Sequence, residues 1–266
     1  MRKLLTSGAG TLGIAAILLL SACTSASTPS SAAPSSTTTA TTVAGAAPTA
    51  VASTSGASQP EPGHTCPATS AQIPAGAHQQ QTADVDYDGA PDTLWLADVN
   101  GTRTLGIRTA SGATFSTTFT SAAPQAALAF GQKMADENAP SIILLDTGRS
   151  VQLYTVADCA IVPTKNAQGA QYKFDLGFAG TGTGVECTSD GGGYTLAGLL
   201  AQPSTAGGTE TVYRTPIKLS NYGRRASNGT RQTLSSRVDS QSALAKRATS
   251  VSCGANNTAV TEPQAG

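Results

Sequence analysis

The sequence predicts an all-β domain built from propeller-like repeats, with a β-sandwich as the alternative. Short segments rich in Val, Leu, Ile and Thr alternate with turn residues every 8 to 12 positions, which is typical of short strands. One stretch, Leu234–Ala248, has a helical pattern, and its apolar face is thin. A 14-residue segment recurs at a spacing near 50 residues, the period of a propeller blade with several strands.

Residues 1–22 predict an export signal followed by a lipid-anchor site. Arg2 and Lys3 precede an apolar run over residues 12–20, shorter than the roughly 20 residues that span a membrane. The tetrapeptide LSAC that ends at Cys23 resembles the bacterial lipobox. This resemblance implies acylation of Cys23 and a lipid anchor on the outer face of the bacterial cell membrane. The alternative is a secreted protein in which Cys23 follows the signal by chance.

Amino-acid composition divides the rest of the chain into three parts. Residues 23–63 are mostly Ser, Thr, Ala and Pro with almost no charge, so we expect a disordered stalk that carries the lipid and lifts the domain from the bilayer. Residues 64–254 provide one folded all-β domain whose C-terminal part is basic. Residues 255–266 are expected to form a disordered tail.

An acidic loop over residues 84–92 has the pattern D-x-D-x-D-G-x-x-D. Alternate residues of such a loop point inward, and Gly89 permits the sharp turn, so the pattern suits a hard cation with oxygen ligands. It is not an EF-hand, because Trp95 occupies the place of the bidentate Glu. The alternative is an ion-free acidic turn held by side-chain to main-chain hydrogen bonds. We expect one Ca²⁺ site, with these ligands: the carboxylates of Asp84, Asp86, Asp88 and Asp92 and the carbonyl of Ala90.

The segment after the loop alternates as a strand does, with Leu94 and Leu96 on one face. Trp95 and Tyr87 flank the loop. Core packing is the default interpretation for both aromatic residues, and a sugar-stacking platform is the alternative. Further strands are expected at residues 105–109, 114–120, 142–145, 151–156, 172–176 and 194–199.

The repeated segment occupies residues 84–97, 133–146 and 186–199. The second and third copies lack several of the carboxylates, so we expect calcium only in the first copy. D-x-D-x-D-G-x-x-D before a strand, at this period, resembles the FG-GAP or VCBS-type repeats of integrin-like propellers and of VCBS-repeat lipoproteins from high-GC Gram-positive bacteria. The resemblance implies a Ca²⁺-stabilised scaffold used for adhesion or recognition. Those families usually have more blades than this chain can encode, which leaves a small or partial propeller or a sandwich.

Beyond Cys23 there are four cysteines: Cys66, Cys159, Cys187 and Cys253. An even number in an exported protein predicts two disulfides, for which three pairings exist. We favour Cys159–Cys187 as a local link and Cys66–Cys253 as a link between the two ends of the domain. Zinc binding is disfavoured because no C-x-x-C pair or histidine accompanies these cysteines.

Charge is unevenly distributed in a chain that is neutral overall. Residues 61–210 contain fourteen acidic and six basic residues, whereas residues 211–253 contain eight basic residues and one acidic residue. The basic part either packs against the acidic part or contacts an anionic polymer or lipid headgroups. Nucleic acid is not expected for a tethered extracytoplasmic protein. A polyanion clamp would use Arg224, Arg225, Arg231 and Arg237.

Catalytic motifs are not found in the sequence. His64 and His78 have no ligand spacing, and no G-x-S-x-G elbow is present. The leading hypothesis is a non-catalytic, calcium-stabilised binding or scaffold module of the cell envelope. Its partners would be the membrane, through the lipid, and a cell-wall glycan, an anionic polymer or an envelope protein. The alternative is an envelope hydrolase that acts on glycan or phosphoester.

Overall fold

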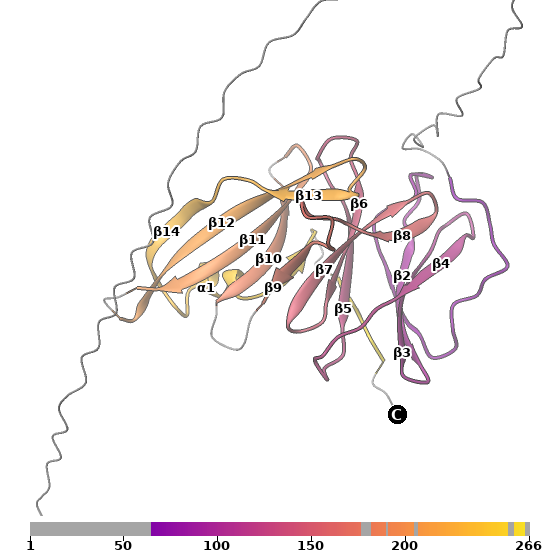
Figure 1. Cartoon of the computed structure of the whole chain (residues 1–266), viewed down its shortest axis with the longest axis horizontal. Coiled ribbons are helices and arrows are strands. Elements are labelled where there is room, and N and C mark those ends of the chain that lie inside the picture. Colours follow the sequence, from indigo (N-terminus) through magenta and orange to yellow (C-terminus); the bar gives the residue numbers. More distant parts are fainter. Residues whose placement is uncertain (1–64, 177–181, 190, 205–206, 255–257, 264–266) are drawn as a thin grey trace, which may run out of the picture. The chain divides into compact units, whose positions relative to one another are not determined.

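The fold was analysed in a computed structural model that describes residues 65–176, 182–189, 191–204, 207–254 and 258–263 (Figure 1). The export signal, Cys23 and the stalk predicted for residues 23–63 lie outside the described residues. The described chain is nearly all β and forms three sheets, none of them closed on itself. The predicted all-β class is confirmed.

The first sheet is an antiparallel meander in which Trp95 is a core residue. Its indole is 2% exposed and lies across Gly106 on the neighbouring strand, where a Cβ atom would approach the ring to 2.0 Å. A glycine is therefore needed at position 106 for the ring to lie flat. The strand order is β1-β2-β3-β4, with bounds β1 (His78–Gln81), β2 (Thr93–Val99), β3 (Thr102–Arg108) and β4 (Thr114–Thr118).

The second sheet repeats the four-strand meander and gains a strand at its open edge. The order is β16-β5-β6-β7-β8, and β9 also pairs with β7. The bounds are β5 (Leu128–Lys133), β6 (Ser141–Asp146), β7 (Ser150–Ala157), β8 (Ala160–Pro163), β9 (Lys173–Asp175) and β16 (Val260–Thr261).

The third sheet has the order β13-β12-β11-β10-β15, in which β15 runs parallel to β10 and β14 also pairs with β12. The strands are β10 (Thr183–Ser189), β11 (Tyr194–Pro203), β12 (Thr209–Ser220), β13 (Arg225–Asn228), β14 (Gln232–Asp239) and β15 (Val251–Cys253).

Helix α1 (Ala243–Ala248) is short, and the helix predicted over Leu234–Ala248 is wrong for most of its length. Residues 232–239 pair with β12 instead, because strand pairing satisfies their main-chain groups. Ser242 caps the helix by accepting a hydrogen bond from Ala245 N–H. Within the described residues we find no helix with the length and apolar character needed to cross a membrane.

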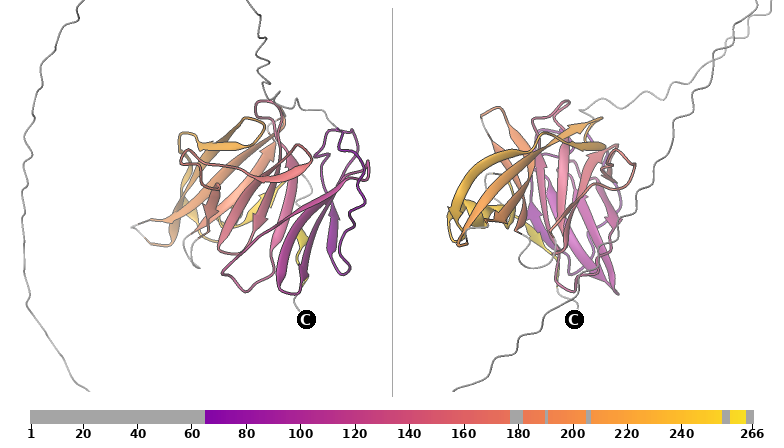
Figure 2. Two further views of the ribbon diagram at one scale, coloured as in Figure 1. Left: turned by 45° about the vertical axis from the view of Figure 1, so that its right-hand side comes forward. Right: turned by 60° about the vertical axis from the view of Figure 1, so that its left-hand side comes forward.

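The three sheets and the helix pack as successive layers (Figures 1 and 2). Strand β6 shows why the second sheet lies in the middle. Ile143 and Leu145 join a core shared with the first sheet, whereas Ile142 and Leu144 join a core shared with the third. All four side chains are fully buried, so the strand is a continuous apolar run. A third, smaller core lies between the third sheet and α1.

The internal repeat corresponds to a structural repeat. Residues 84–97, 133–146 and 186–199 each include the turn of the first hairpin in a sheet and the start of that sheet's second strand. These hairpins are β1–β2, β5–β6 and β10–β11. Each is followed by two further antiparallel strands, which gives three blade-like units of four consecutive strands.

The four cysteines form two disulfides, but the favoured pairing is wrong. The bonds are Cys66–Cys159 and Cys187–Cys253. Cys66 lies in the segment before β1 and reaches the β7–β8 turn of the second sheet. Cys187 and Cys253 are paired neighbours on β10 and β15. The prediction relied on the short sequence separation between Cys159 and Cys187. It failed because the C-terminal segment with Cys253 returns to the third sheet as its edge strand.

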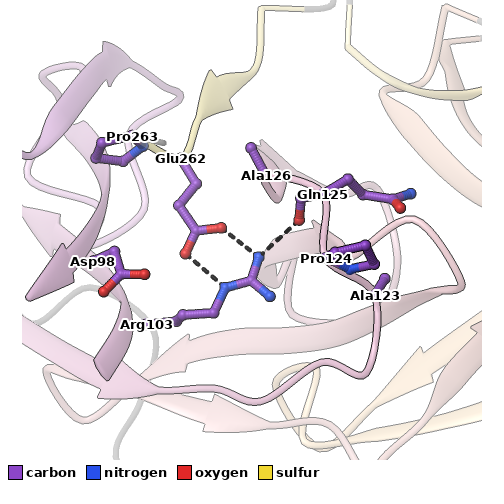
Figure 3. Close-up of a pocket in the computed structure, with 8 residues that line it drawn as sticks. All are labelled: Asp98, Arg103, Ala123, Pro124, Gln125, Ala126, Glu262 and Pro263. Atoms are coloured by element: carbon purple, nitrogen blue, oxygen red, sulfur yellow. Dashed lines mark hydrogen bonds and ion pairs between the residues drawn. The ribbon is translucent and has the colours of Figure 1, made fainter. Parts of the chain in front are cut away.

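The C-terminal tail predicted for residues 255–266 is folded where the structure describes it. Strand β16 pairs with β5, and Glu262 follows it into a cleft at the first sheet (Figure 3). Glu262 is 3% exposed and makes a two-pronged ion pair with Arg103, with Arg103 Nε 2.7 Å from Oε1. Its Oε2 also accepts the N–H of Ala127 at 2.9 Å. The prediction was wrong because this partner lies far away in the sequence.

Candidate metal centre

The acidic loop connects β1 to β2, and its backbone gathers three of the predicted ligands. Tyr87 and Gly89 have positive φ values of 65° and 91°, which fold the chain tightly between the aspartates. One carboxylate oxygen from each of Asp84, Asp86 and Asp88 lies within 4.8 Å of the other two. Three carboxylates at this separation repel one another, and a hard cation between them would remove the repulsion.

Asp84 supplies the oxygen that most clearly fits a cation. Its Oδ2 accepts the N–H of Gly89 at 3.1 Å. Its Oδ1 is buried and has no hydrogen-bond partner among the described residues. A buried carboxylate oxygen without a partner is costly, and a bound ion with oxygen ligands such as Ca²⁺ would satisfy it.

Asp86 is the innermost member of the group, 4% exposed. Its Oδ2 accepts the N–H of Cys66 at 3.1 Å, and its Oδ1 accepts the N–H of Asp88 at 3.3 Å. Burial raises the pKa of Asp86, the two N–H groups offset part of the rise, and the charges of Asp88 and Asp84 add to it.

Asp92, a predicted ligand, lies outside the group of three and braces the loop. It is 1% exposed, and its Oδ2 accepts the N–H of Val85 at 2.7 Å. Its Oδ1 accepts the N–H of Ala110, in the β3–β4 turn, at 2.9 Å. Burial raises the pKa of Asp92 to about 6, against the effect of both N–H groups. The fifth predicted ligand residue, Ala90, stays beside the group, because its N–H donates to Asp88 Oδ1 at 2.8 Å.

The loop rests on the hairpin of the second sheet. The hydroxyl of Tyr87 donates to the carbonyl of Ala139 at 2.6 Å, and Lys133 Nζ lies 4.5 Å from the centre of the Tyr87 ring. Tyr87 is therefore held by protein contacts, and Trp95 is buried. Core packing, the default interpretation, is confirmed for Trp95.

In the third copy of the repeated segment, the buried acidic residue forms ion pairs with arginines. Glu186 occupies the position of Asp84, is 2% exposed and forms ion pairs with Arg214 and Arg247 at 3.3 and 3.2 Å. Guanidinium groups here balance the negative charge. In the second copy Asp136 Oδ1 accepts the N–H of Leu219 at 3.0 Å, which ties that turn to β12.

The four arginines of the predicted polyanion clamp do not form one cluster. Arg224 makes an ion pair with Asp158, and Arg231 stacks over the ring of Tyr213 at 3.7 Å. Arg225 pairs with one end of the 12-residue strand β12, whereas Arg237 lies in the part of β14 that pairs with the other end. In the described structure these positive charges are therefore distributed along β12 and its neighbouring strands and are not gathered at one point.

Sequence reasoning missed the main-chain groups that hold the acidic loop in place. Cys66, Ala110 and Ala139 are separated from the residues they bind by 20, 18 and 52 positions. They contribute N–H or C=O groups, which every residue type carries, so their side chains gave no signal. The cysteine at position 66 was visible, but only as a disulfide candidate.

Comparison with known proteins gives no relative for this chain. No protein-family model, no curated protein sequence and no solved structure matches it. The geometry described above is therefore the basis for the functional argument.

Proposed function

We propose that this chain is a non-catalytic, calcium-stabilised binding or scaffold module of a bacterial cell envelope, anchored by a lipid at Cys23. Asp84, Asp86 and Asp88 would hold the ion. Bound calcium would supply positive charge to the acidic loop and thereby order the connection between the first two strands of the domain. The role is structural, because the neighbouring buried carboxylate Asp92 uses both oxygens to hold main-chain N–H groups.

The observation that carries the proposal is the buried Oδ1 of Asp84, which has no hydrogen-bond partner in the part of the chain that the structure describes and belongs to a group of three carboxylates. Hydrogen bonds within the loop satisfy the other oxygen of Asp84 and one oxygen of Asp88. Both oxygens of Asp86 already accept main-chain N–H groups, so Asp86 would bind the ion through a second lone pair on one of them. A cation there and at the remaining oxygens of Asp84 and Asp88 would complete the set with the ligand chemistry that calcium prefers.

Thermal unfolding of the full-length protein in detergent, in 10 mM Ca²⁺ and in excess EDTA, tests the proposal. A site with the roughly 10⁻⁴–10⁻³ M affinity of extracellular modules would add about 1.4–2.7 kcal/mol to the free energy of unfolding. At roughly 2–4 °C per kcal/mol for a domain of this size, the melting temperature should rise by several degrees. The rise should disappear in Asp84→Asn.

Asp98→Asn is the matched control, because Asp98 Oδ1 also accepts a turn N–H, that of Gly101, outside the group of three. It should keep the full calcium response. Identical melts of the unmodified protein in Ca²⁺ and EDTA would reject the calcium site. Turnover of generic esterase, phosphatase or glycosidase substrates by the same protein would favour the hydrolase alternative instead.

A further inference from the structure

A polar cleft of about 570 Å³ lies beside the acidic loop, where strands of the three sheets meet. Gln80 and Gln81 come from β1, Gln132 comes from β5, and Tyr194 begins β11. Cys253 of β15 completes the wall from the third sheet. The volume lies within the range of about 300–1,000 Å³ found for small-molecule sites.

The chemistry of this cleft selects a particular kind of ligand. Glutamine amides carry both donors and an acceptor, of which Gln132 already uses one donor on the carbonyl of Lys133 at 3.1 Å, and Tyr194 adds a ring and a hydroxyl. Sugar hydroxyls also donate and accept, so they match amide groups in pairs. The C–H face of a sugar ring can pack on an aromatic ring. We propose that this cleft binds an uncharged glycan, an assignment that rests on the proposed binding function and names its ligand class.

The absence of charge in the wall distinguishes this cleft from the two other clefts described. None of the described residues that line it is acidic or basic. The cleft of Figure 3 contains the Arg103–Glu262 ion pair, and a third cleft includes Asp136, Arg214 and Lys218. A phosphate, sulfate or uronic acid in the glutamine cleft would lose its hydration without gaining a counter-charge. The neutral wall therefore favours a neutral ligand.

The cleft shares a wall with the acidic loop. Thr82, Ala83 and Pro91 line it and lie at the two ends of the loop that contains Asp84, Asp86 and Asp88. Thr82 is fixed on the second sheet, because its hydroxyl donates to the carbonyl of Gly131 at 2.9 Å. A loop ordered by calcium would thus fix one side of the glycan site.

Binding of the full-length protein in detergent to immobilised neutral oligosaccharides tests this proposal, with glucan, mannan, galactan and arabinan fragments as probes. Polygalacturonate and dextran sulfate serve as charged comparators. We expect retention on at least one neutral probe and a loss of about tenfold or more in affinity in the double variant Gln80→Ala/Gln81→Ala, because hydrogen bonds to the ligand are removed.

Gln79→Ala is the matched control, since Gln79 is also exposed on β1 but does not line the cleft. It should bind as the unmodified protein does. Failure to bind any neutral probe, binding to charged probes alone, or equal binding by the double variant would overturn the assignment. Calcium melts of the same preparations separate the two proposals. A calcium response without neutral-glycan binding rejects the glycan site and leaves the calcium-stabilised module intact.

Discussion

Buried carboxylate oxygens among the described residues have three kinds of surroundings. Asp92 accepts main-chain N–H groups, Glu186 and Glu262 pair with arginines, and Asp84 keeps one buried oxygen that no described group satisfies. The first two arrangements stabilise the carboxylate with groups already in the fold. The third leaves a position for a cation. The same type of residue thus has a different role according to what its neighbours donate.

Asp146 provides a pH-dependent prediction at this scale. Burial raises its pKa above the ordinary value of 3.8, and the N–H of Gly148, 2.7 Å from Oδ1, offsets part of that rise. The folded protein therefore binds this proton more tightly than the unfolded chain, and the ionised carboxylate destabilises the fold at neutral pH. Asp146→Asn keeps an oxygen acceptor for Gly148 and should melt at a higher temperature at pH 7.

The advantage of Asp146→Asn should shrink as the pH falls through the raised pKa and should vanish below about 3.8, where the native carboxyl is also neutral. Melting temperatures of both proteins from pH 3 to pH 8 give the comparison. Asp98→Asn, at the half-buried end of β2 beside the β2–β3 turn, controls for loss of one negative charge. A constant difference at every pH would contradict the assignment to burial of the charge.

The candidate site was predictable to the extent that it is local. The alternation of Asp84, Asp86 and Asp88 with Gly89 after them was sufficient to place three carboxylates together. Asp92 fits the same spacing pattern, yet its carboxylate binds the N–H of Ala110, a group from another turn. Spacing along the chain describes a loop alone and carries no information on which distant main-chain group will compete for its oxygens.

At the level of elements, the two-residue strand β16 brings the C-terminal segment into contact with two sheets. It adds a strand to the second sheet, and Glu262 immediately after it binds Arg103 on β3 of the first sheet. The pair also raises the pKa of Arg103, since the adjacent carboxylate favours the charged guanidinium. The C-terminal segment therefore links the first two sheets, from which it is far apart in sequence.

Removing one partner of this pair should be costly. Glu262→Ala would leave the partly buried Arg103 without its carboxylate and the N–H of Ala127 without its acceptor. We expect a loss of about 3–5 kcal/mol in the free energy of unfolding, measured by urea denaturation. The double variant Arg103→Leu/Glu262→Leu should recover part of that loss, because no unpaired charge remains. A loss below about 1 kcal/mol in Glu262→Ala would show that the pair behaves as a surface ion pair.

At the scale of the whole molecule, the two disulfides connect different parts of the fold. Cys66–Cys159 joins the segment before the first sheet to the second sheet, whereas Cys187–Cys253 lies within the third sheet. The first is joined directly to the acidic loop, because the N–H of Cys66 donates to Asp86 Oδ2. The two bonds should therefore differ in their effect on the proposed calcium site.

Two matched double variants, Cys66→Ser/Cys159→Ser and Cys187→Ser/Cys253→Ser, separate these effects. Both should lower the free energy of unfolding, by up to about 4–5 kcal/mol in the chain-entropy model, because each bond closes a long loop. Only Cys66→Ser/Cys159→Ser should also reduce the rise in melting temperature that calcium produces. An equal calcium response in both variants would contradict a link between the disulfide and the loop.

The fold was predictable where a periodic pattern in the sequence was sufficient to indicate the structure. Alternating apolar residues and the 50-residue repeat led to strands and to three similar units, because period and spacing are visible in one dimension. The pairing of Cys66 with Cys159 and the burial of Glu262 depend on the order in which sheets stack. Residues 232–239 became a strand for the same reason, since β12 offered an edge that local propensity did not reveal.

The Cys66–Cys159 bond also determines how mechanical force would enter the domain. A pull on the chain from its N-terminal side reaches a covalent link at Cys66 before it reaches β1. The load would then pass directly to the middle sheet, whose strands β6 and β7 are buried on both faces, and the hairpins of the first sheet would be shielded. Reduction of this single bond would let the same force unzip the first sheet from its edge.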